Sequence, residues 1–401
     1  MNRGRRSGPN KAAGRRNDNN RIYAHPLPLL FTSPEPIGTS SFSSLLGSLG
    51  LGGSRLEVLN PHCEGVFDPA TRSVWVTNAK DSRILWTRGF FGKGNLSRSE
   101  PSWLARQVNA RKDRAAGKSM TSEEVTAKRR AERKQFKVDR ARAIAQAAAE
   151  AEAAFREGRI VSLEETKANI PSAATWKPSS SAITSASVST SGLNDEDEAP
   201  LEDVEHLQLT LPEAFFLCWA LDCLTVLDPK SMEPMTLQDI WIAFQSAHLP
   251  LPLGVGSVQG QETLRPDNPF LINYVFHHHY RSLGWVVKNG IKFCVDYLLY
   301  KRGPVFHHAE FAFVLMPVYE DEEDKTSSPF SLPNVEPFTW QWLSTVNRVN
   351  SQVQKTLILA YVTIPARKRM SKEVLGSPAC FEHYSIREIA LRRFIPARMR
   401  D

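Results

Sequence analysis

Hydrophobic and polar positions follow two different periods in the C-terminal half of the chain. Between residues 207 and 282, apolar residues recur at helical spacing in "LTLPEAFFLCWALDCLTVL", "TLQDIWIAFQSA" and "NPFLINYVFHHHYRSLG". Thr210 with Glu213 three residues later is a capping-box pattern. Asn268 or Asp267, followed by Pro269, indicates another helix start. These patterns predict a helical subdomain over residues 207–282.

From residue 283 the pattern changes to short apolar runs. "WVVKNGIKFCVDYLLYK" predicts a hairpin with a tight turn at Asn289 and Gly290. "AEFAFVLMPVY" and "KTLILAYVTIP" predict strands, and "EPFTWQWLSTVNRVNSQVQ" predicts a helix between them. Residues 283–401 are therefore predicted to form a small α/β domain. Strand 356–364 and the terminal segment are expected to be its docking edges.

The N-terminal half divides into three predicted segments. Residues 1–54, basic and then rich in Pro, Ser and Gly, are expected to be disordered. Residues 55–105 are expected to be globular, with a strand at "SVWVTN" and a helix beginning at "DSRILW". Residues 106–206 are expected to hold a long charged helix, from about Thr121 to Arg159, and then a disordered linker. The basic half of that helix is either a solvated or coiled-coil surface or an RNA-binding one.

Composition and charge indicate what class of partner and what compartment to expect. The 401-residue chain has a net charge of +7 and 41% hydrophobic residues, which is compatible with a sizeable core and a polyanionic partner. The N-terminal "MNRGRRSGPNKAAGRR" is a nuclear address, an RNA-touching arm or a simple basic tail. The sequence has no run of 18 or more apolar residues, so no membrane span is expected. The five cysteines are scattered, as expected for buried thiols in a reducing compartment.

Neither zinc nor another cofactor is expected. Cys218 and Cys223 have no matching second pair for a zinc site. The run His277–His279 lies in a predicted helix, where consecutive side chains point about 100° apart and chelate poorly. These histidines are interpreted as surface or interface residues.

The stretch "YLLYKRGPVFHHAEFAF" (297–313) carries the candidate chemistry. A strand ends at Tyr300, the chain turns, and His307 and His308 precede the next apolar run; Lys355 begins a later strand. Tyrosine, histidine and lysine can supply a base, an acid and a cation for attack of an RNA 2′-OH on the neighbouring phosphate, without a metal. Because the reference pKa of tyrosine is about 10, Lys355 is expected to lie close enough to favour the phenolate.

Several segments together resemble a known family. "YKRGPVFHHAEFAF" with "NRVNSQVQKTLILAYV" resembles the catalytic domain of tRNA-splicing endonucleases. "GFFGKGNLSRSEPSW", "LPEAFFLCWALDCL" and "FHHHYRSLGWVVKNGIKFCVDYLLY" extend the resemblance to the eukaryotic, and more narrowly fungal, catalytic subunit that cuts the 5′ splice site. The resemblance covers roughly residues 56–105 and 207–400. It implies a restriction-endonuclease-like α/β catalytic domain (283–401).

The resemblance also implies residue roles. Tyr300 would be the general base, His308 the general acid and Lys355 the stabiliser of the transition state, giving 2′,3′-cyclic phosphate and 5′-OH ends. His308 is chosen over His307 because it precedes Ala309 and an apolar strand, and because adjacent strand residues face opposite sides.

Two further residues are implied in RNA binding. Arg348 corresponds to a family arginine that holds a flipped intron base against an aromatic ring. The family usually has a tryptophan as this aromatic, and here Phe394 takes its place. The pair would serve either this active site or a partner's.

The resemblance implies the setting of the reaction. The expected partners are precursor tRNA, a second catalytic subunit and two non-catalytic subunits in a heterotetramer. The expected compartment is the nucleus, or alternatively the cytosolic face of the mitochondrial outer membrane.

Two other functions compete with this interpretation. Pro266 and Asp267 with Glu323 and Lys325 match a metal-dependent PD…E-x-K nuclease, although Asp267 is explained as a helix cap and the acidic run Glu320–Asp324 reads as an exposed loop. A non-catalytic, architectural RNA-binding subunit is the other alternative, and the intact set of Tyr300, His308 and Lys355 argues against it.

Overall fold

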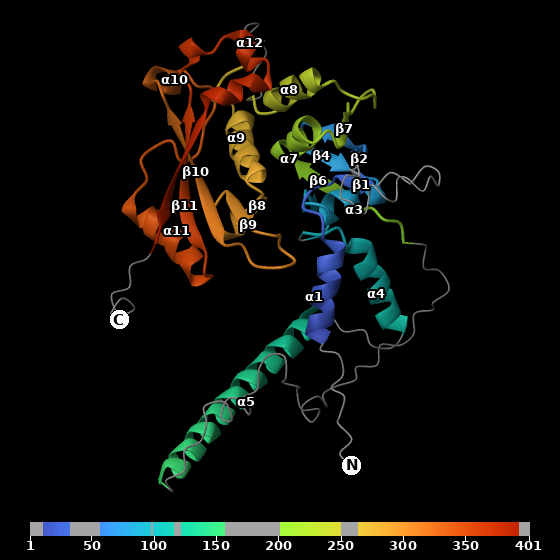
Figure 1. Cartoon of the computed structure of the whole chain (residues 1–401), viewed down its shortest axis with the longest axis vertical. Helices are drawn as coiled ribbons and strands as arrows, with labels where there is room; N and C mark the ends of the chain where they lie inside the picture. Colours follow the sequence, from blue (N-terminus) through green and yellow to red (C-terminus); the bar gives the residue numbers. More distant parts are fainter. Residues whose placement is uncertain are drawn as a thin grey trace, which may run out of the picture. The chain divides into compact units, whose positions relative to one another are not determined.

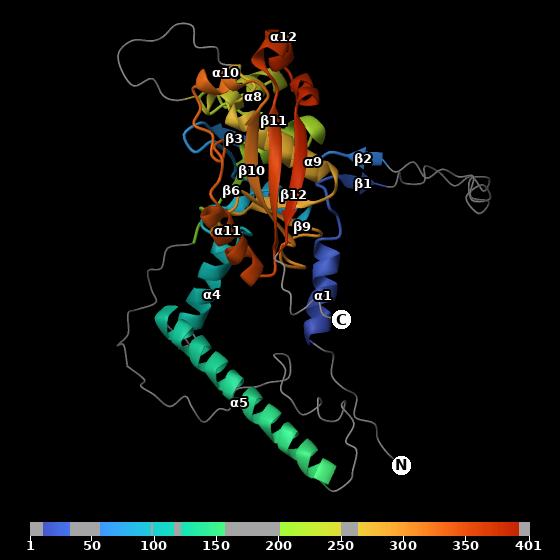
Figure 2. The same cartoon turned by 90° about the vertical axis from the view of Figure 1, so that its left-hand side faces the viewer.

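The computed structural model describes residues 11–32, 57–97, 99–115, 122–156, 201–249 and 264–392 (Figures 1 and 2). It divides into two compact units, residues 1–13 with 104–203 and residues 14–103 with 204–401. The first unit contains the 35-residue helix α5 (Ser122–Arg156), which lies inside the range predicted for the charged helix. Among the described residues, no helix has the length and apolar character needed to span a membrane.

The second unit contains a five-stranded catalytic sheet, drawn in orange and red in Figure 1. The strand order is β12-β11-β10-β9-β8, with β10 and β11 parallel and the other pairs antiparallel. The strands are β8 (Val286–Asn289), β9 (Tyr297–Tyr300), β10 (Phe311–Tyr319), β11 (Thr356–Ile364) and β12 (Ser385–Leu391).

Both faces of this sheet are covered. Alternate residues of β10 and β11 point to opposite sides, so Phe313 and Ile358 pack with helix α9 (Pro269–Ser282), while Val314 and Leu359 pack with helix α11 (Trp340–Gln352). Burial on two faces explains why these strands read as continuous apolar runs in the sequence. The predicted α/β class is confirmed.

The same unit contains a second five-stranded sheet, of order β5-β6-β4-β3-β7. Its strands are β3 (Cys63–Asp68), β4 (Ser73–Val76), β5 (Lys93–Gly94), β6 (Leu207–Thr210) and β7 (Leu224–Leu227). Its β3 and β7 are parallel partners, and β4 pairs with β6. The predicted segments 55–105 and 207–282 therefore share one sheet, and one apolar core joins it through α9 to the catalytic sheet.

Shorter elements complete the described chain. They are α1 (Lys11–Ile22), β1 (Leu30–Thr32), β2 (Glu57–Leu59), α3 (Ala79–Thr87), α4 (Trp103–Ala115), α7 (Leu211–Phe215), η2 (Phe216–Ala220), α8 (Leu237–Ser246), η3 (Ile291–Phe293), α10 (Glu322–Thr326), η4 (Arg367–Arg369), α12 (Lys372–Leu375) and η5 (Pro378–His383).

Local sequence signals fix several helix starts. Thr210 and Glu213 form the predicted capping box of α7, and Thr236 with Asp239 forms another at α8. Asn268, and not Asp267, caps α9. Each cap satisfies backbone N–H groups that have no partner within the helix.

The helix predicted in "LTLPEAFFLCWALDCLTVL" begins at the predicted cap, Thr210, but it ends earlier than the apolar pattern indicates. Helical structure covers residues 211–220, and strands β6 and β7 flank it. The flanking "LQLT" and "LTVL" pair with β4 and β3, and this tertiary pairing overrides the helical period read from the sequence.

Three other expectations need correction. The β8–β9 hairpin forms, but residues 290–296 with helix η3 connect its strands in place of a tight turn. Strand β11 is paired on both sides, so it is not a docking edge, whereas β12 is an edge strand, and docking there stays a prediction. Residues 11–32, assigned to a disordered tail, contain α1 and β1, and β1 pairs with β2. The rest of that tail and the linker 157–200 lie outside the described residues.

Candidate active site

Three chain segments meet at one end of the catalytic sheet. Strand β9 ends at Tyr300, β10 begins at Phe311 and β11 begins at Thr356, directly after Lys355. Because β9 is antiparallel to β10 and β10 is parallel to β11, these ends lie at the same edge. The topology therefore brings together the residues that the sequence separates by 55 positions.

Backbone hydrogen bonds tie the three segments at this edge. Glu310 N donates to Leu299 O at 3.1 Å, and Thr356 N donates to Glu310 O at 3.0 Å. Glu310 therefore lies between the neighbours of Tyr300 and Lys355. Two strand spacings separate the backbones of β9 and β11, which is about 10 Å, a span that two long side chains can close around a phosphate.

Tyr300 is half-buried. Its ring packs against the apolar cluster under α11 and also against a second cluster formed by Trp86, Phe90 and Val286. Burial raises the pKa of Tyr300 above its usual value, and Lys355 is not among the causes. The prediction that Lys355 lowers this pKa in the free subunit is wrong, because desolvation of the phenolate decides the direction.

Lys355 is buried to 8% exposure, and its Nζ lies 4.8 Å from the centre of the Phe293 ring. Asn350, at the end of α11, accepts a 3.0 Å hydrogen bond from Lys355 N and donates its side-chain amide to Phe293 O. Burial lowers the pKa of Lys355. Within the described chain no carboxylate forms an ion pair with it, so its charge is available to a phosphate.

The two candidate histidines lie in the segment 301–310, which is not a strand, and both are exposed. The rule of alternating strand side chains therefore does not decide between them, and the choice of His308 over His307 stays a prediction. Gly303, which precedes them in the chain, has φ +121°, a backbone conformation that residues with a side chain rarely adopt.

Of the two residues expected to hold an RNA base, Arg348 is exposed on α11. Phe394 lies outside the described residues. The predicted pairing of Arg348 with Phe394 therefore stays a prediction.

The metal-nuclease alternative finds no geometric support. Asp267 is buried in an ion pair with Arg265 at 2.9 Å and accepts a hydrogen bond from Tyr319. Lys325 pairs with Glu336 at 3.0 Å. Throughout the described ranges, no group of three His, Cys, Asp or Glu side chains is arranged to hold a metal ion. The Glu320–Asp324 run is also more structured than expected, because it leads into α10 and pairs with η4.

The expectation that His277 is a surface or interface residue is wrong, because its side chain is buried within the fold. It is 2% exposed, its ring meets Phe216 edge-to-face, and burial lowers its pKa well below the usual value. His279, two positions on, is exposed.

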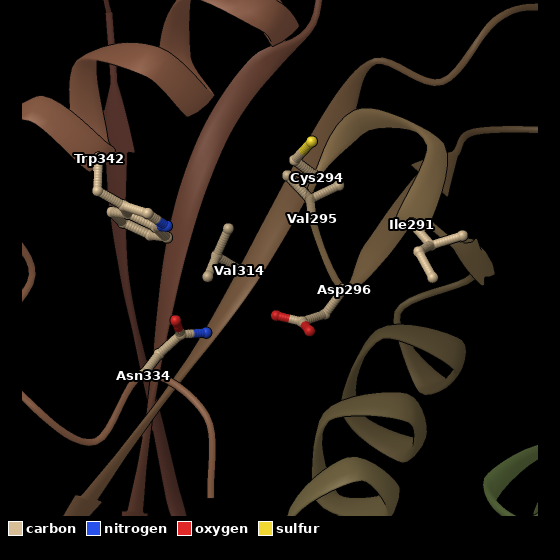
Figure 3. A pocket seen from close by; sticks show the side chains of 7 residues that line it. All are labelled: Ile291, Cys294, Val295, Asp296, Val314, Asn334 and Trp342. Atoms are coloured by element: carbon tan, nitrogen blue, oxygen red, sulfur yellow. The ribbon is translucent and has the colours of Figure 1, made fainter.

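A cavity of about 250 Å³ lies beside the residues that precede β9 (Figure 3). Asp296 points into it from the start of β9 and accepts a 2.8 Å hydrogen bond from Leu315 N. Because Tyr300 lies at the other end of β9, the cavity is not part of the candidate site. Its lining residues are Ile291, Cys294, Val295, Asp296, Val314, Asn334 and Trp342.

Sequence reasoning missed the contacts from the N-terminal segment. The ring of Phe90 lies directly over Gly303, where an added Cβ would be 2.2 Å from Phe90 Cε2. The signal was present in "GFFG", since two bulky apolar residues between glycines are unusual in a solvated turn.

Comparison with known proteins places this geometry in a family. Residues 270–369 match the model of the tRNA intron endonuclease catalytic C-terminal domain, a range that includes Tyr300, His308, Arg348 and Lys355. The chain is 36% identical to the probable tRNA-splicing endonuclease subunit sen2 of Schizosaccharomyces pombe, over 81% of this chain and 84% of that protein.

Two other fungal proteins show the same extent of similarity. The tRNA-splicing endonuclease subunit SEN2 of Eremothecium gossypii is 32% identical, over 81% of this chain and 83% of its own length. That of Saccharomyces cerevisiae is 30% identical, over 85% and 86%. The predicted family and the predicted enzyme class are confirmed. Because it is similar to these subunits over more than four fifths of its length, the chain belongs to the tRNA-splicing endonucleases, among their Sen2 subunits.

Proposed function

We propose that this chain cuts precursor tRNA at the 5′ exon–intron junction and leaves 2′,3′-cyclic phosphate and 5′-OH ends. The observation that supports this most is the convergence of Tyr300, the 301–310 segment and Lys355 at one sheet edge. The names of the relatives support the substrate class.

In the proposed reaction the 2′-oxygen of the last exon nucleotide forms a bond to phosphorus, and the bond from phosphorus to the 5′-oxygen breaks. Tyr300 takes the proton of the 2′-OH, and His308 gives a proton to the leaving 5′-oxygen. The ammonium of Lys355 faces the charge that develops on the phosphate oxygens, in a site where burial strengthens the interaction. This account needs three side chains and no metal.

We further propose that the chain works in a heterotetramer with a second catalytic and two non-catalytic subunits. Its β12 is an edge strand, with main-chain groups on one side that β11 does not pair. Arg348, exposed on α11, would hold a displaced intron base with Phe394, in this active site or a partner's. The nucleus is the proposed compartment.

The deciding experiment is cleavage of an intron-containing precursor tRNA by the reconstituted complex in excess EDTA, with both junctions mapped. His308→Ala should slow the 5′ cut by about 100-fold or more, as expected for loss of a positioned acid, and leave the 3′ cut unchanged. His307→Ala, the adjacent exposed histidine, is the matched control and should cut normally.

Other outcomes reject parts of this proposal. Loss of all cutting in EDTA would return the metal-dependent alternative. Normal 5′ cutting by His308→Ala, with assembly intact, would return the architectural one, and a loss confined to His307→Ala would move the acid to that residue.

A further inference from the structure

We infer that Phe90, which lies outside the catalytic sheet, is a positioning residue that holds the 301–308 turn so that His308 can reach the scissile phosphate. This inference rests on the proposed function and extends the active site to the N-terminal segment. The residues concerned all belong to the larger compact unit.

The ring of Phe90 fills the space beside the turn. Phe90 is 3% exposed, and its Cε2, Cδ2 and Cζ atoms would all lie within 2.7 Å of a Cβ added at Gly303. Gly303 is therefore required both by its φ of +121° and by this close approach. A side chain at position 303 would displace either the turn or the ring.

Three other aromatic residues enclose Phe90. Tyr23 stacks on it at 5.1 Å between ring centres, and Trp86 and Phe306 meet it edge-to-face at 5.7 and 6.5 Å. Phe306 itself belongs to the turn, immediately before His307. We call Tyr23, Trp86, Phe90 and Phe306 the aromatic cluster.

The backbone that presents Phe90 is unusual. Phe90 has φ +59°, between Gly89 at +109° and Gly92 at +71°. A bulky residue in the left-handed region is rare and persists where the surroundings impose it, often at functional sites. In this chain, the contacts that impose the conformation of Phe90 can be named.

Two cations, the buried Arg281 and the partly buried Lys288, hold this loop. Arg281 of α9 donates to Gly89 O at 2.6 Å, and Lys288 of β8 donates to Gly92 O at 2.6 Å. Glu213 accepts a 3.1 Å hydrogen bond from Gly92 N and pairs with Lys288. The position of Phe90 is thus set relative to the strand that pairs with β9, and so relative to Tyr300.

The turn has weak internal support of its own. Its backbone hydrogen bonds Phe306 N to Gly303 O and His307 N to Gly303 O measure 3.2 and 3.4 Å, at the long end of the normal range. Arg302 lies over the Phe306 ring at 4.2 Å and reaches Asn20, so further contacts also come from the N-terminal segment. Packing from residues 20–23 and 90 therefore decides where His308 lies.

The test uses Phe90→Leu in the full-length chain within the reconstituted complex, and measures single-turnover cleavage and precursor tRNA affinity separately. Leucine stays apolar but lacks the ring over Gly303. We expect the 5′ rate constant to fall about tenfold or more, since small misplacements of catalytic groups are costly. The dissociation constant, assembly and the 3′ cut should change less than about twofold, because the substrate-binding surfaces are not altered.

The matched control is Phe67→Leu, the same change at a buried ring of the second sheet, on β3, that packs on Phe244. It should leave both cuts unchanged. A double-mutant cycle gives the second readout: if Phe90 acts through His308, adding Phe90→Leu to His308→Ala should cost almost nothing further.

A normal 5′ rate for Phe90→Leu while His308→Ala is inactive would overturn this inference alone. Full additivity of the two changes, or an equal loss at both junctions, would reduce Phe90 to a structural role and overturn it too. Normal cutting by His308→Ala would instead reject the proposed function, and this inference with it.

Discussion

Tyr300 has the most demanding role in the proposed reaction, because it must lose its own proton before it can accept another. Burial by Trp86, Phe90 and the cluster under α11 raises its pKa, so little phenolate exists at neutral pH in the free subunit. The proposed chemistry therefore depends on a small ionised fraction of Tyr300. As long as the pH is below that pKa, this fraction rises about tenfold for each unit by which the pH is raised.

This dependence gives a pH prediction. The wild-type 5′ single-turnover rate should rise with pH at the acid end of the profile, where the phenolate fraction of Tyr300 rises while the general acid is still protonated. Tyr300→Phe has nothing to ionise and should give a low rate without that rise. Rapid-quench measurements between pH 5.5 and 9 check both profiles. Identical slopes in the two proteins would show that Tyr300 is not the base.

His277 gives a stability prediction on the same scale. Its folded pKa lies well below the unfolded value of about 6.5, so the unfolded state binds the proton first. The stability that neutral His277 permits is fully present above pH 6.5 and is lost as pH falls, by at most about 1.4 kcal/mol per pH unit. His277→Leu should flatten this acid loss in thermal unfolding between pH 7 and 5. His279→Gln, on the exposed side of α9, should keep it.

The sequence could locate Tyr300 and Lys355, because both lie where an apolar strand meets a polar turn. It could not give the direction of the Tyr300 pKa, since Trp86 and Phe90, which help to bury it, are more than 200 residues away in the chain. Nor could it reveal that His277 is buried, because Phe216 covers it from another helix.

At the scale of elements, the loop 89–92 depends on one buried carboxylate. Glu213 caps α7, accepts from Gly92 N and pairs with Lys288 at 3.6 Å. Lys288 is partly buried, with 16% of its side chain exposed, and desolvation lowers its pKa to about 8 while Glu213 opposes this. The Glu213 side chain thus stabilises the start of α7, the loop 89–92 and the charge of Lys288.

Glu213→Gln should show how much the charge contributes. Glutamine keeps one acceptor oxygen, which can still cap α7, but it loses the charge and the second oxygen, which accepts from Gly92 N. We expect a loss of about 3 kcal/mol, since Lys288 and Arg281 would then share a buried site with no anion. Denaturant unfolding measures it. Asp239→Asn, at the equivalent cap position of the exposed α8 start, should cost much less. Equal losses would mean that the charge of Glu213 contributes no more than that of an exposed capping carboxylate.

Helices with clear caps and strands buried on both faces could be predicted from the sequence, as α8, α9, β10 and β11 show. Strands β6 and β7 could not, because each has four residues and gains its identity from pairing with β4 and β3. The β8–β9 connection was also missed, since Gly290 packs against Val295 and the chain continues into η3 before it returns.

At the scale of the whole molecule, residues 104–203 leave and rejoin the larger unit at one place. Strand β5 pairs with β6 across the gap, Asn95 N donates to His206 O at 3.1 Å, and Trp103 N donates to Glu205 at 2.6 Å. The two chain ends of the insertion are thus close within the fold that carries the site.

Replacing residues 106–202 with a short Gly/Ser linker should therefore leave the fold and the 5′ cut unchanged. The sequence left open whether the basic half of α5 binds RNA. A dissociation constant for precursor tRNA within about twofold of wild type would favour the solvated helix; a marked weakening that disappears at high salt would favour the RNA contact. A fall of the melting temperature by more than a few degrees would show that the insertion is structural.

The hydrogen bonds from Arg281 and Lys288 to the 89–92 loop set a limit on how small an expressed fragment can be. The matched catalytic domain, residues 270–369, contains both cations but lacks Gly89, Gly92 and Glu213. Produced alone, it would expose to solvent the Arg281 and Lys288 side chains, which the loop 89–92 contacts in the full chain, together with the apolar surface around them. A soluble minimal enzyme should therefore begin before residue 57 and retain β3, β4 and the loop, even though none of them falls within the domain that bears the family's name.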